Sequence, residues 1–197
     1  MLKMNSQKIL NFNFPIKDSL SNFYVNDTNS QAFDGILKNK NDNEFYLTGP
    51  AKSGKSFIAK LWATENNALI LNDNFDQLIN ASQNILIDNF DNTLDQEKIF
   101  HILNHCKLNK LKILIVSKFE INEIKITLED LTSRLKAFLY FKIKNPDDDM
   151  LLNILTKLFV DKQFIINSHD VFQFIIKRAN RSYEEIFHIV SRLDSLS

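Results

Sequence analysis

The sequence is short of the residues on which small disulfide-bonded or zinc-binding proteins depend. Among its 197 residues there are one cysteine, three prolines and three glycines. A single cysteine, Cys106, excludes an internal disulfide and a zinc site made of cysteines, and it suits a reducing compartment. We therefore expect a cytoplasmic protein.

The sequence also lacks an excess of either charge and lacks long apolar runs. It carries 24 basic and 24 acidic residues, so its formal net charge is zero. Proteins that grip DNA usually carry a basic excess, so we expect no strong direct DNA binding. No apolar run approaches the roughly 18 residues that span a bilayer, so no membrane association is expected. What the chain does have is 44% apolar residues, including 17 phenylalanines, enough for the core of one domain with a small appendage.

Two of the three glycines stand within eight consecutive residues that match the phosphate-binding pattern G-x-x-x-x-G-K-[ST]. In this pattern the glycines let backbone N–H groups curl around phosphates, the lysine reaches the β and γ oxygens, and the final hydroxyl ligates Mg²⁺. A strand over residues 44–48 and a helix over residues 55–65 supply the strand–loop–helix setting that the loop needs. The chain is therefore expected to bind ADP or ATP through Gly49, Pro50, Ala51, Lys52, Ser53, Gly54, Lys55 and Ser56.

An acidic residue, Asp88, follows the short apolar run of residues 85–87. This pattern is typical of a buried parallel strand that delivers a carboxylate to its C-terminal end, where Asp88 and Ser56 would share a Mg²⁺ ion. The next residue is Asn89, which cannot act as a base. Either hydrolysis is slow, or Asp91 substitutes as the base, or the nucleotide serves mainly as a structural switch.

Two further polar residues have a functional and a plain interpretation. Ser117 ends an apolar strand over residues 112–117, and a strand between the phosphate loop and the attacking water needs a polar tip to sense the γ-phosphate. The plain alternative is a serine in the turn after the strand. Arg134, on a helix over residues 128–135, is either a solvated helix arginine or an arginine finger that points at a neighbouring subunit's nucleotide.

The order of apolar segments predicts an α/β fold with a helical appendage. Apolar runs predict five strands, which form one parallel sheet, and 3.6-residue periodicity predicts helices between them. The expected strands are residues 44–48, 68–71, 85–88, 112–117 and 138–144. The helix over residues 29–37 either walls an adenine ring or packs on the core. The predicted fold class is a three-layer αβα core of residues 22–145, with a small α-helical lid of residues 146–197.

Residues 1–21 are polar, with interspersed apolar side chains, and are interpreted as a flexible arm. Within the arm, apolar side chains follow a glutamine, in the manner of short peptides that bind the bacterial replication sliding clamp. Two alignments of the match are open, and the apolar side chains alternatively cover the domain's own core. The residues concerned are Gln7, Leu10, Phe12 and Phe14.

The order of these features resembles the AAA+ family, and within it the bacterial DnaA/Hda group of replication initiators and their small regulators. The match runs from about residue 10 to the end; its sharper pieces are the phosphate loop, residues 87–89, and the segment L-x-D-L-x-S-R-L over residues 128–135. An Hda-type regulator is favoured over an initiator on two grounds. Residues 72–84 are too few for the initiator's helical insertion, and the sequence ends at the lid, before any DNA-binding domain.

The resemblance implies a regulator that, with the DNA-loaded sliding clamp, makes a DnaA-type initiator hydrolyse its ATP. It implies that Arg134 is the arginine finger acting in trans, and it strengthens the assignment of the arm as a clamp-binding peptide. A homodimer is left open. The sequence departs from the family at Glu184, where a lid arginine usually senses the nucleotide; Arg181, three residues earlier, could stand in.

Other functions remain open at this stage. A helicase-loader or transposition-helper ATPase would bind a helicase or DNA, which the neutral charge disfavours. A small P-loop kinase would need substrate-binding arginines between core strands, yet the arginines all lie late in the chain, at positions 134, 178, 181 and 192. A scaffold would use the nucleotide only to stabilise its fold.

Overall fold

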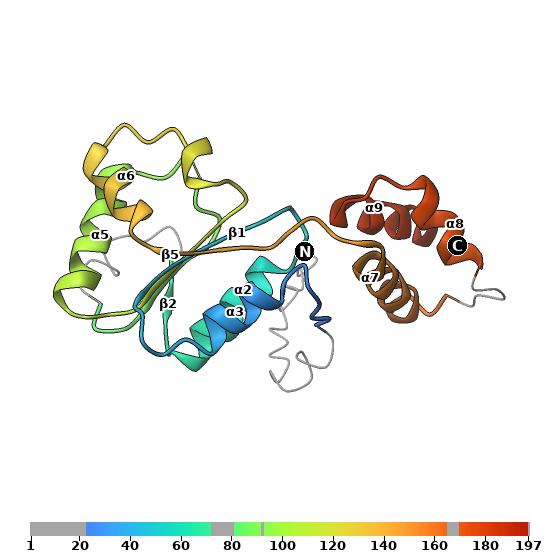
Figure 1. Ribbon diagram of the computed structural model, residues 1–197, viewed down its shortest axis with the longest axis horizontal. Helices are drawn as coiled ribbons and strands as arrows, with labels where there is room; N and C mark the ends of the chain where they lie inside the picture. Colours follow the sequence, from blue (N-terminus) through green and yellow to red (C-terminus); the bar gives the residue numbers. More distant parts are fainter. Residues whose placement is uncertain (1–22, 72–80, 92, 165–169, 197) are drawn as a thin grey trace, which may run out of the picture.

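The computed structural model describes residues 23–71, 81–91, 93–164 and 170–196. They form a core with a central sheet and a group of three helices at one end of it (Figure 1). The predicted α/β fold class is confirmed, since five parallel strands lie in one sheet and the C-terminal region is helical.

The strand order β2-β3-β4-β1-β5 places the strand that leads into the phosphate loop, β1, between β4 and β5. The ends of β1 and β4 lie level, with Thr48 opposite Ser117. Because all strands are parallel, their C-terminal ends meet at one edge, which is where ligands bind in open α/β sheets. The strands are β1 (Glu44–Thr48), β2 (Leu69–Ile70), β3 (Ile85–Ile87), β4 (Ile113–Ser117) and β5 (Leu139–Lys142).

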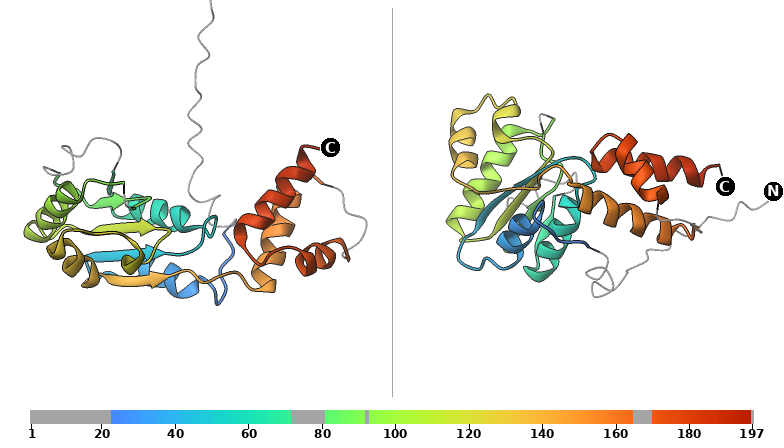
Figure 2. Two further views of the ribbon diagram at one scale, coloured as in Figure 1. Left: turned by 90° about the horizontal axis from the view of Figure 1, so that it is seen from above. Right: turned by 45° about the vertical axis from the view of Figure 1, so that its right-hand side comes forward.

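Helices cover both faces of the sheet, because its central strands are apolar on both sides. One face carries Tyr46, Ile85 and Ile113 against α5 and α6, and the other carries Phe45 and Leu47 against α2 and α3. Figures 1 and 2 show α5 and α6 together at the end of the molecule far from the C-terminal helices. The core helices are α2 (Ser30–Leu37), α3 (Lys55–Glu65), α5 (Gln96–Leu108), the 3₁₀ turn η1 (Ile121–Glu123) and α6 (Glu129–Lys136).

The lid consists of α7 (Asp148–Asp161), α8 (Asp170–Arg178) and α9 (Tyr183–Asp194), which share a small core of their own. Side-chain caps fix two helix starts: Asp147 accepts from the N–H of Met150, and Ser182 accepts from that of Glu185. Helical spacing from Ile186 and Val190 predicts that Leu193 faces inward, and this prediction is wrong. Leu193 is 39% exposed, because it lies in the last turn of α9 beyond the lid's core.

None of the helices in the described part of the chain is long and apolar enough to cross a membrane.

Candidate nucleotide site

The phosphate loop joins β1 to α3, and its two glycines are required by backbone geometry. Gly54 has φ +90, and a Cβ there would lie 2.6 Å from Cε2 of Phe23. At Gly49, where φ is +156, a Cβ would lie 2.9 Å from both Cβ and the carbonyl oxygen of Ile143. A side chain at either position would push the loop away from its neighbours. The loop conformation thus depends on the two glycines that the motif singles out.

Lys55 lies in the first turn of α3 and folds back over the loop. Its Nζ donates to the carbonyl oxygens of Gly49, at 2.7 Å, and Pro50, at 2.6 Å. Burial lowers the pKa of Lys55, and the negative charge of Asp88 partly offsets this effect. The loop lysine is thus within electrostatic range of the acid at the end of β3, although the two are 33 positions apart in the sequence (88 minus 55).

Two of the predicted metal ligands are placed at the same edge of the sheet. Ser56 is exposed in the first turn of α3, and Asp88 is half-buried directly after β3. A hydroxyl and a carboxylate are the oxygen donors that Mg²⁺ prefers, and two protein ligands leave room for phosphate oxygens and water. No cluster of three His, Cys, Asp or Glu side chains suited to a metal occurs among the described residues. By their chemistry, Ser56 and Asp88 would suit a Mg²⁺ ion that arrives with a nucleotide.

The hydroxyl at the tip of β4 is already engaged in the fold. Ser117 is 1% exposed; its Oγ donates to the carbonyl oxygen of Phe90 at 2.6 Å and accepts from the N–H of Phe119 at 3.0 Å. Beside it, the hydroxyls of Thr48 and Tyr46 both donate to the carbonyl oxygen of Phe119, each at 3.0 Å. In this arrangement Ser117 ties the ends of β3 and β4 together. A γ-phosphate would have to compete with these bonds.

The residues after β3 offer little general-base chemistry. Asn89 has φ +60, in the left-handed region, and its N–H donates to the side chain of Asp88 at 2.9 Å. Asp91 accepts from both the hydroxyl and the N–H of Thr93, at 2.6 and 2.8 Å. These two bonds lower the pKa of Asp91, and a carboxylate with a lower pKa is a weaker base.

A cavity of about 510 Å³ opens between the loop and the lid. It reaches the phosphate loop at Lys52, Ser53 and Gly54, and the buried Oγ of Ser53 has no hydrogen-bond partner among the described residues. Apolar and polar side chains from three parts of the chain alternate around it. The other lining residues are Phe23, Tyr24, Asn29, Met150, Asn153, Ile154, Lys157, Leu158, Asp161, Tyr183 and Phe187.

Arg134 lies away from this cavity. It belongs to α6, on the sheet face opposite α3, and α6 and the lid lie at opposite ends of the molecule (Figures 1 and 2). Its guanidinium carbon stands 5.7 Å from the centre of the Phe100 ring of α5. One terminal nitrogen of the guanidinium is buried and has no hydrogen-bond partner within the described ranges.

The lid candidate Arg181 is paired within the lid. Its guanidinium donates to the carboxylate of Asp148 at 3.0 Å, and both side chains are more than half exposed. Glu184, in the first turn of α9, is exposed. The clamp-peptide candidates Gln7, Leu10, Phe12 and Phe14 lie outside the described residues.

Solved structures with this fold include replication initiators. A DNA replication initiation factor matches with a TM-score of 0.74 at 16% identity, covering 95% of this chain and 66% of that one. Domain III of DnaA from Thermotoga maritima matches at 0.68 and 18% identity, covering 91% of this chain and 86% of that domain. DnaA from Aquifex aeolicus bound to AMPPCP matches at 0.67 and 16% identity, covering 85% of this chain and 62% of that protein.

These likenesses show that the chain has the α/β fold of the AAA+ ATPase domain of DnaA. The chain spans less than two thirds of the length of the Aquifex protein and of the initiation factor. No protein-family model matches the sequence, and no curated protein matches it.

The sequence did not identify the cavity residues that lie far from the phosphate loop along the chain. Tyr24, Asn153 and Phe187 line it, but they belong to no motif and are brought together only by folding. The one signal that could have pointed to them is the resemblance itself, since it places a lid over the loop.

Proposed function

We propose that this protein is a nucleotide-binding AAA+ regulator that represses chromosome replication by promoting ATP hydrolysis on a DnaA-type initiator, together with the sliding clamp. One observation carries the proposal. Arg134 lies on α6, on the sheet face opposite α3, and it is not among the residues that line the cavity at its own phosphate loop. An arginine in that place is suited to a nucleotide on another protein.

The ligand of the chain's own site would be ADP or ATP. Lys55 would exchange its bonds to the loop carbonyls for bonds to phosphate oxygens, while Ser56 and Asp88 would hold Mg²⁺. The positive end of the α3 dipole adds to the attraction for phosphate. The likeness to the AMPPCP-bound DnaA of Aquifex aeolicus supports an adenine nucleotide.

Turnover at this site is expected to be slow. Asn89 cannot accept a proton from water, and the hydrogen bonds from Thr93 weaken Asp91 as a base. The hydroxyl of Ser117 is engaged by backbone groups of Phe90 and Phe119. The bound nucleotide would then stabilise the active conformation of the protein rather than drive a cycle of ATP hydrolysis.

Arg134 would act on the ATP bound to the initiator rather than on the nucleotide of its own chain. An unpaired, buried guanidinium N–H costs about 1–3 kcal/mol, so turning the side chain outward to an acceptor on a partner would relieve that cost. A phosphoryl group in transfer spreads negative charge over its oxygens, and a guanidinium placed beside it stabilises that charge. Gln7, Leu10, Phe12 and Phe14 of the arm would recruit the clamp.

The test is the hydrolysis of ATP that has been preloaded on the initiator, measured with DNA-loaded clamp and this protein. Arg134→Ala is expected to slow the stimulated hydrolysis by about 10³-fold while nucleotide binding by this chain is unchanged. Arg178→Ala is the control, because its guanidinium lies on the lid, 3.8 Å from the centre of the Phe174 ring. Full stimulation by the Arg134→Ala protein would refute the proposed role.

A further inference from the structure

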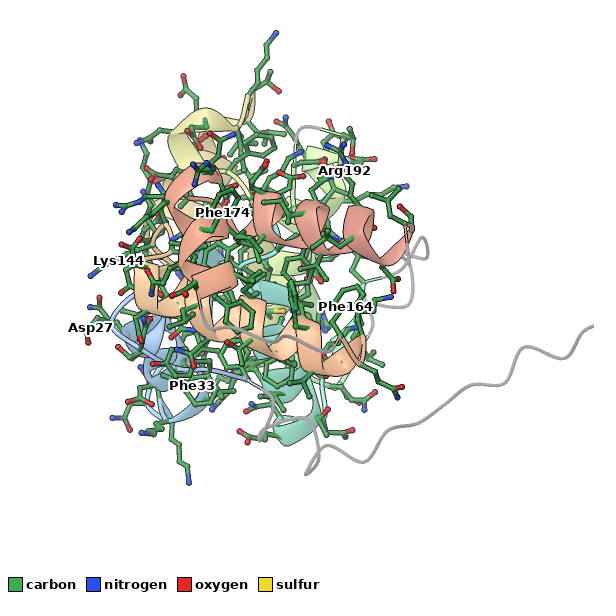
Figure 3. The ribbon with its side chains drawn as sticks, turned by 90° about the vertical axis from the view of Figure 1, so that its right-hand side faces the viewer. Asp27, Phe33, Lys144, Phe164, Phe174 and Arg192 are labelled. Carbon is green, nitrogen blue, oxygen red and sulfur yellow. The ribbon has the colours of Figure 1, made fainter. Side chains whose placement is uncertain are left out.

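Residues 23–29, here called the strap, run between the core and the lid beside the cavity. The strap is anchored firmly on the core. The Phe23 ring stacks on Phe57 and Phe33 with centroids 4.6 and 5.6 Å apart, and it lies against Gly54 of the phosphate loop. Further along, the carbonyl oxygen of Thr28 accepts from the N–H of Lys144 at 2.9 Å. In Figure 3, which looks onto the lid, Asp27 of the strap and Lys144 lie on the same side of the molecule.

The strap is also bonded to the lid. The Tyr24 hydroxyl donates to the carboxylate of Asp149 at 2.6 Å, and the Asn26 amide donates to both oxygens of Asp147, at 3.0 and 3.2 Å. Asp147 is the N-cap of α7 and Asp149 lies in its first turn, so Tyr24 and Asn26 both bond to the N-terminal end of this helix. The bond to Asp149 is the main reason that the pKa of Tyr24 is raised.

A third contact joins the strap to α9. The Tyr183 hydroxyl lies 3.4 Å from that of Thr28 and donates to the carbonyl oxygen of Lys144 at 3.3 Å. Tyr183 is 1% exposed, and it is one of the lid residues that pack into the core of the α/β layer. The lid otherwise has its own apolar core, so its orientation depends on a small number of contacts.

The cavity lies between the parts that the strap joins. Phe23, Tyr24 and Asn29 line it from the strap, facing the phosphate loop on one side and α7 on the other. A nucleotide seated on the loop would therefore lie between the strap and the lid.

We propose that Tyr24 and Asn26 form a latch on the first turn of α7 that holds the lid over the bound nucleotide and sets its rate of release. Tyr24 and Asn26 are positioning residues, because they act through the lid. The latch rests on one part of the proposed function, namely that a nucleotide binds in the cavity.

The test is the release of a fluorescent ADP analogue from the full-length protein, followed by chase with unlabelled ADP. Tyr24→Phe removes one hydroxyl and keeps the ring; it is expected to speed release about three- to tenfold, the effect of losing one ordinary, solvent-exposed hydrogen bond. Tyr140→Phe is the matched control, because Tyr140 on β5 is 40% exposed, like Tyr24 at 39%, and lies outside the cavity lining. Its release rate should equal that of the wild type.

A double-mutant cycle decides whether the effect passes through Asp149. Tyr24→Phe should produce no further acceleration in the Asp149→Ala protein, since the bond is already lost. Additive effects, or a Tyr24→Phe protein that releases ADP at the wild-type rate, would overturn the latch. A wild-type protein that binds no adenine nucleotide would overturn the proposed function as well, so the two failures are distinguishable.

Discussion

Two regions of the molecule, the phosphate loop and the helix α6 that carries Arg134, differ in how their polar groups are arranged. At the phosphate loop, Lys55 is bonded to two carbonyl oxygens and lies near Asp88, and Ser117 is fully hydrogen-bonded. On the opposite face of the sheet, Arg134 rests on the Phe100 ring with a buried N–H that has no partner in the described part of the chain. The loop also has one buried atom without a partner among the described residues, the Oγ of Ser53, but Ser53 lines the cavity, whereas Arg134 lies outside it.

This difference bears on what each region can do. A site whose groups already bond one another can hold a ligand by exchanging those bonds, but it offers no free base to drive hydrolysis. A buried guanidinium nitrogen without an acceptor costs free energy, and under the proposed function a partner would supply that acceptor. The contrast supports a protein that keeps its own nucleotide and acts on that of a partner.

The largest effect is expected from Lys55→Ala, which tests whether the phosphate loop binds the nucleotide. Removing a charge-assisted contact to phosphate should weaken ADP binding by about 100-fold or more, measured by titration calorimetry. Lys60→Ala is the control on the same helix, because Lys60 is exposed and lies outside the cavity lining. Equal ADP affinity in the Lys55→Ala and wild-type proteins would refute the claim that the phosphate loop binds the nucleotide.

A smaller effect is expected from Ser117→Ala, which tests whether Ser117 only joins the ends of β3 and β4 or also senses the γ-phosphate. The substitution leaves the carbonyl oxygen of Phe90 and the N–H of Phe119 without their present partner, so the free energy of unfolding should fall by about 1–3 kcal/mol. Urea denaturation measures it, with the exposed Ser133→Ala as control. The ratio of ATP to ADP affinity, taken on the same proteins, tests the sensing role: an unchanged ratio argues against it.

The smallest effect is a pH dependence at Lys55. Its pKa in the folded protein is lowered, so between that value and 10.5 the folded amine is neutral while the unfolded one is still protonated. The contribution of Lys55 to stability therefore rises with pH in this window, and ADP affinity falls as pH rises through the folded pKa.

The Asp88→Asn protein tests the cause of this pH dependence. Because the charge of Asp88 raises the pKa of Lys55, its removal should move the decline in ADP affinity to lower pH. The titrations are made with EDTA and no Mg²⁺, so that the loss of a metal ligand does not contribute. An unchanged midpoint would show that the two residues do not interact.

The sequence predicted the fold well where periodicity and end signals agree. The strand over residues 44–48 and the helix over residues 55–65 were predicted with the bounds that the structure has, because a loop with two glycines separates them. Asp95, a residue type that favours the N-cap position, indeed caps α5 by accepting from the N–H groups of Glu97 and Lys98. The second strand was expected over four residues but spans only Leu69–Ile70, since strand ends depend on pairing with β3 rather than on local propensity.

Contacts between distant segments could not be predicted. The bond from Tyr24 to Asp149 joins residues 125 positions apart, and no local pattern marks either of them as a partner. The pairing of Arg181 with Asp148 and the engagement of Ser117 by Phe90 are of the same kind. Residue types and spacing identify which groups are suited to a nucleotide, but only the folded chain decides which of them are already occupied.

The central claim is that the consequential hydrolysis takes place on the partner. The direct measurement loads this protein with ATP carrying one γ-phosphate label and the initiator with ATP carrying another, adds DNA-loaded clamp, and follows both released phosphates in one reaction. We predict that release from the initiator is accelerated, that release from this protein stays slow, and that Arg134→Ala abolishes only the former. Rapid release of the label carried by this protein, with none from the initiator, would contradict the account.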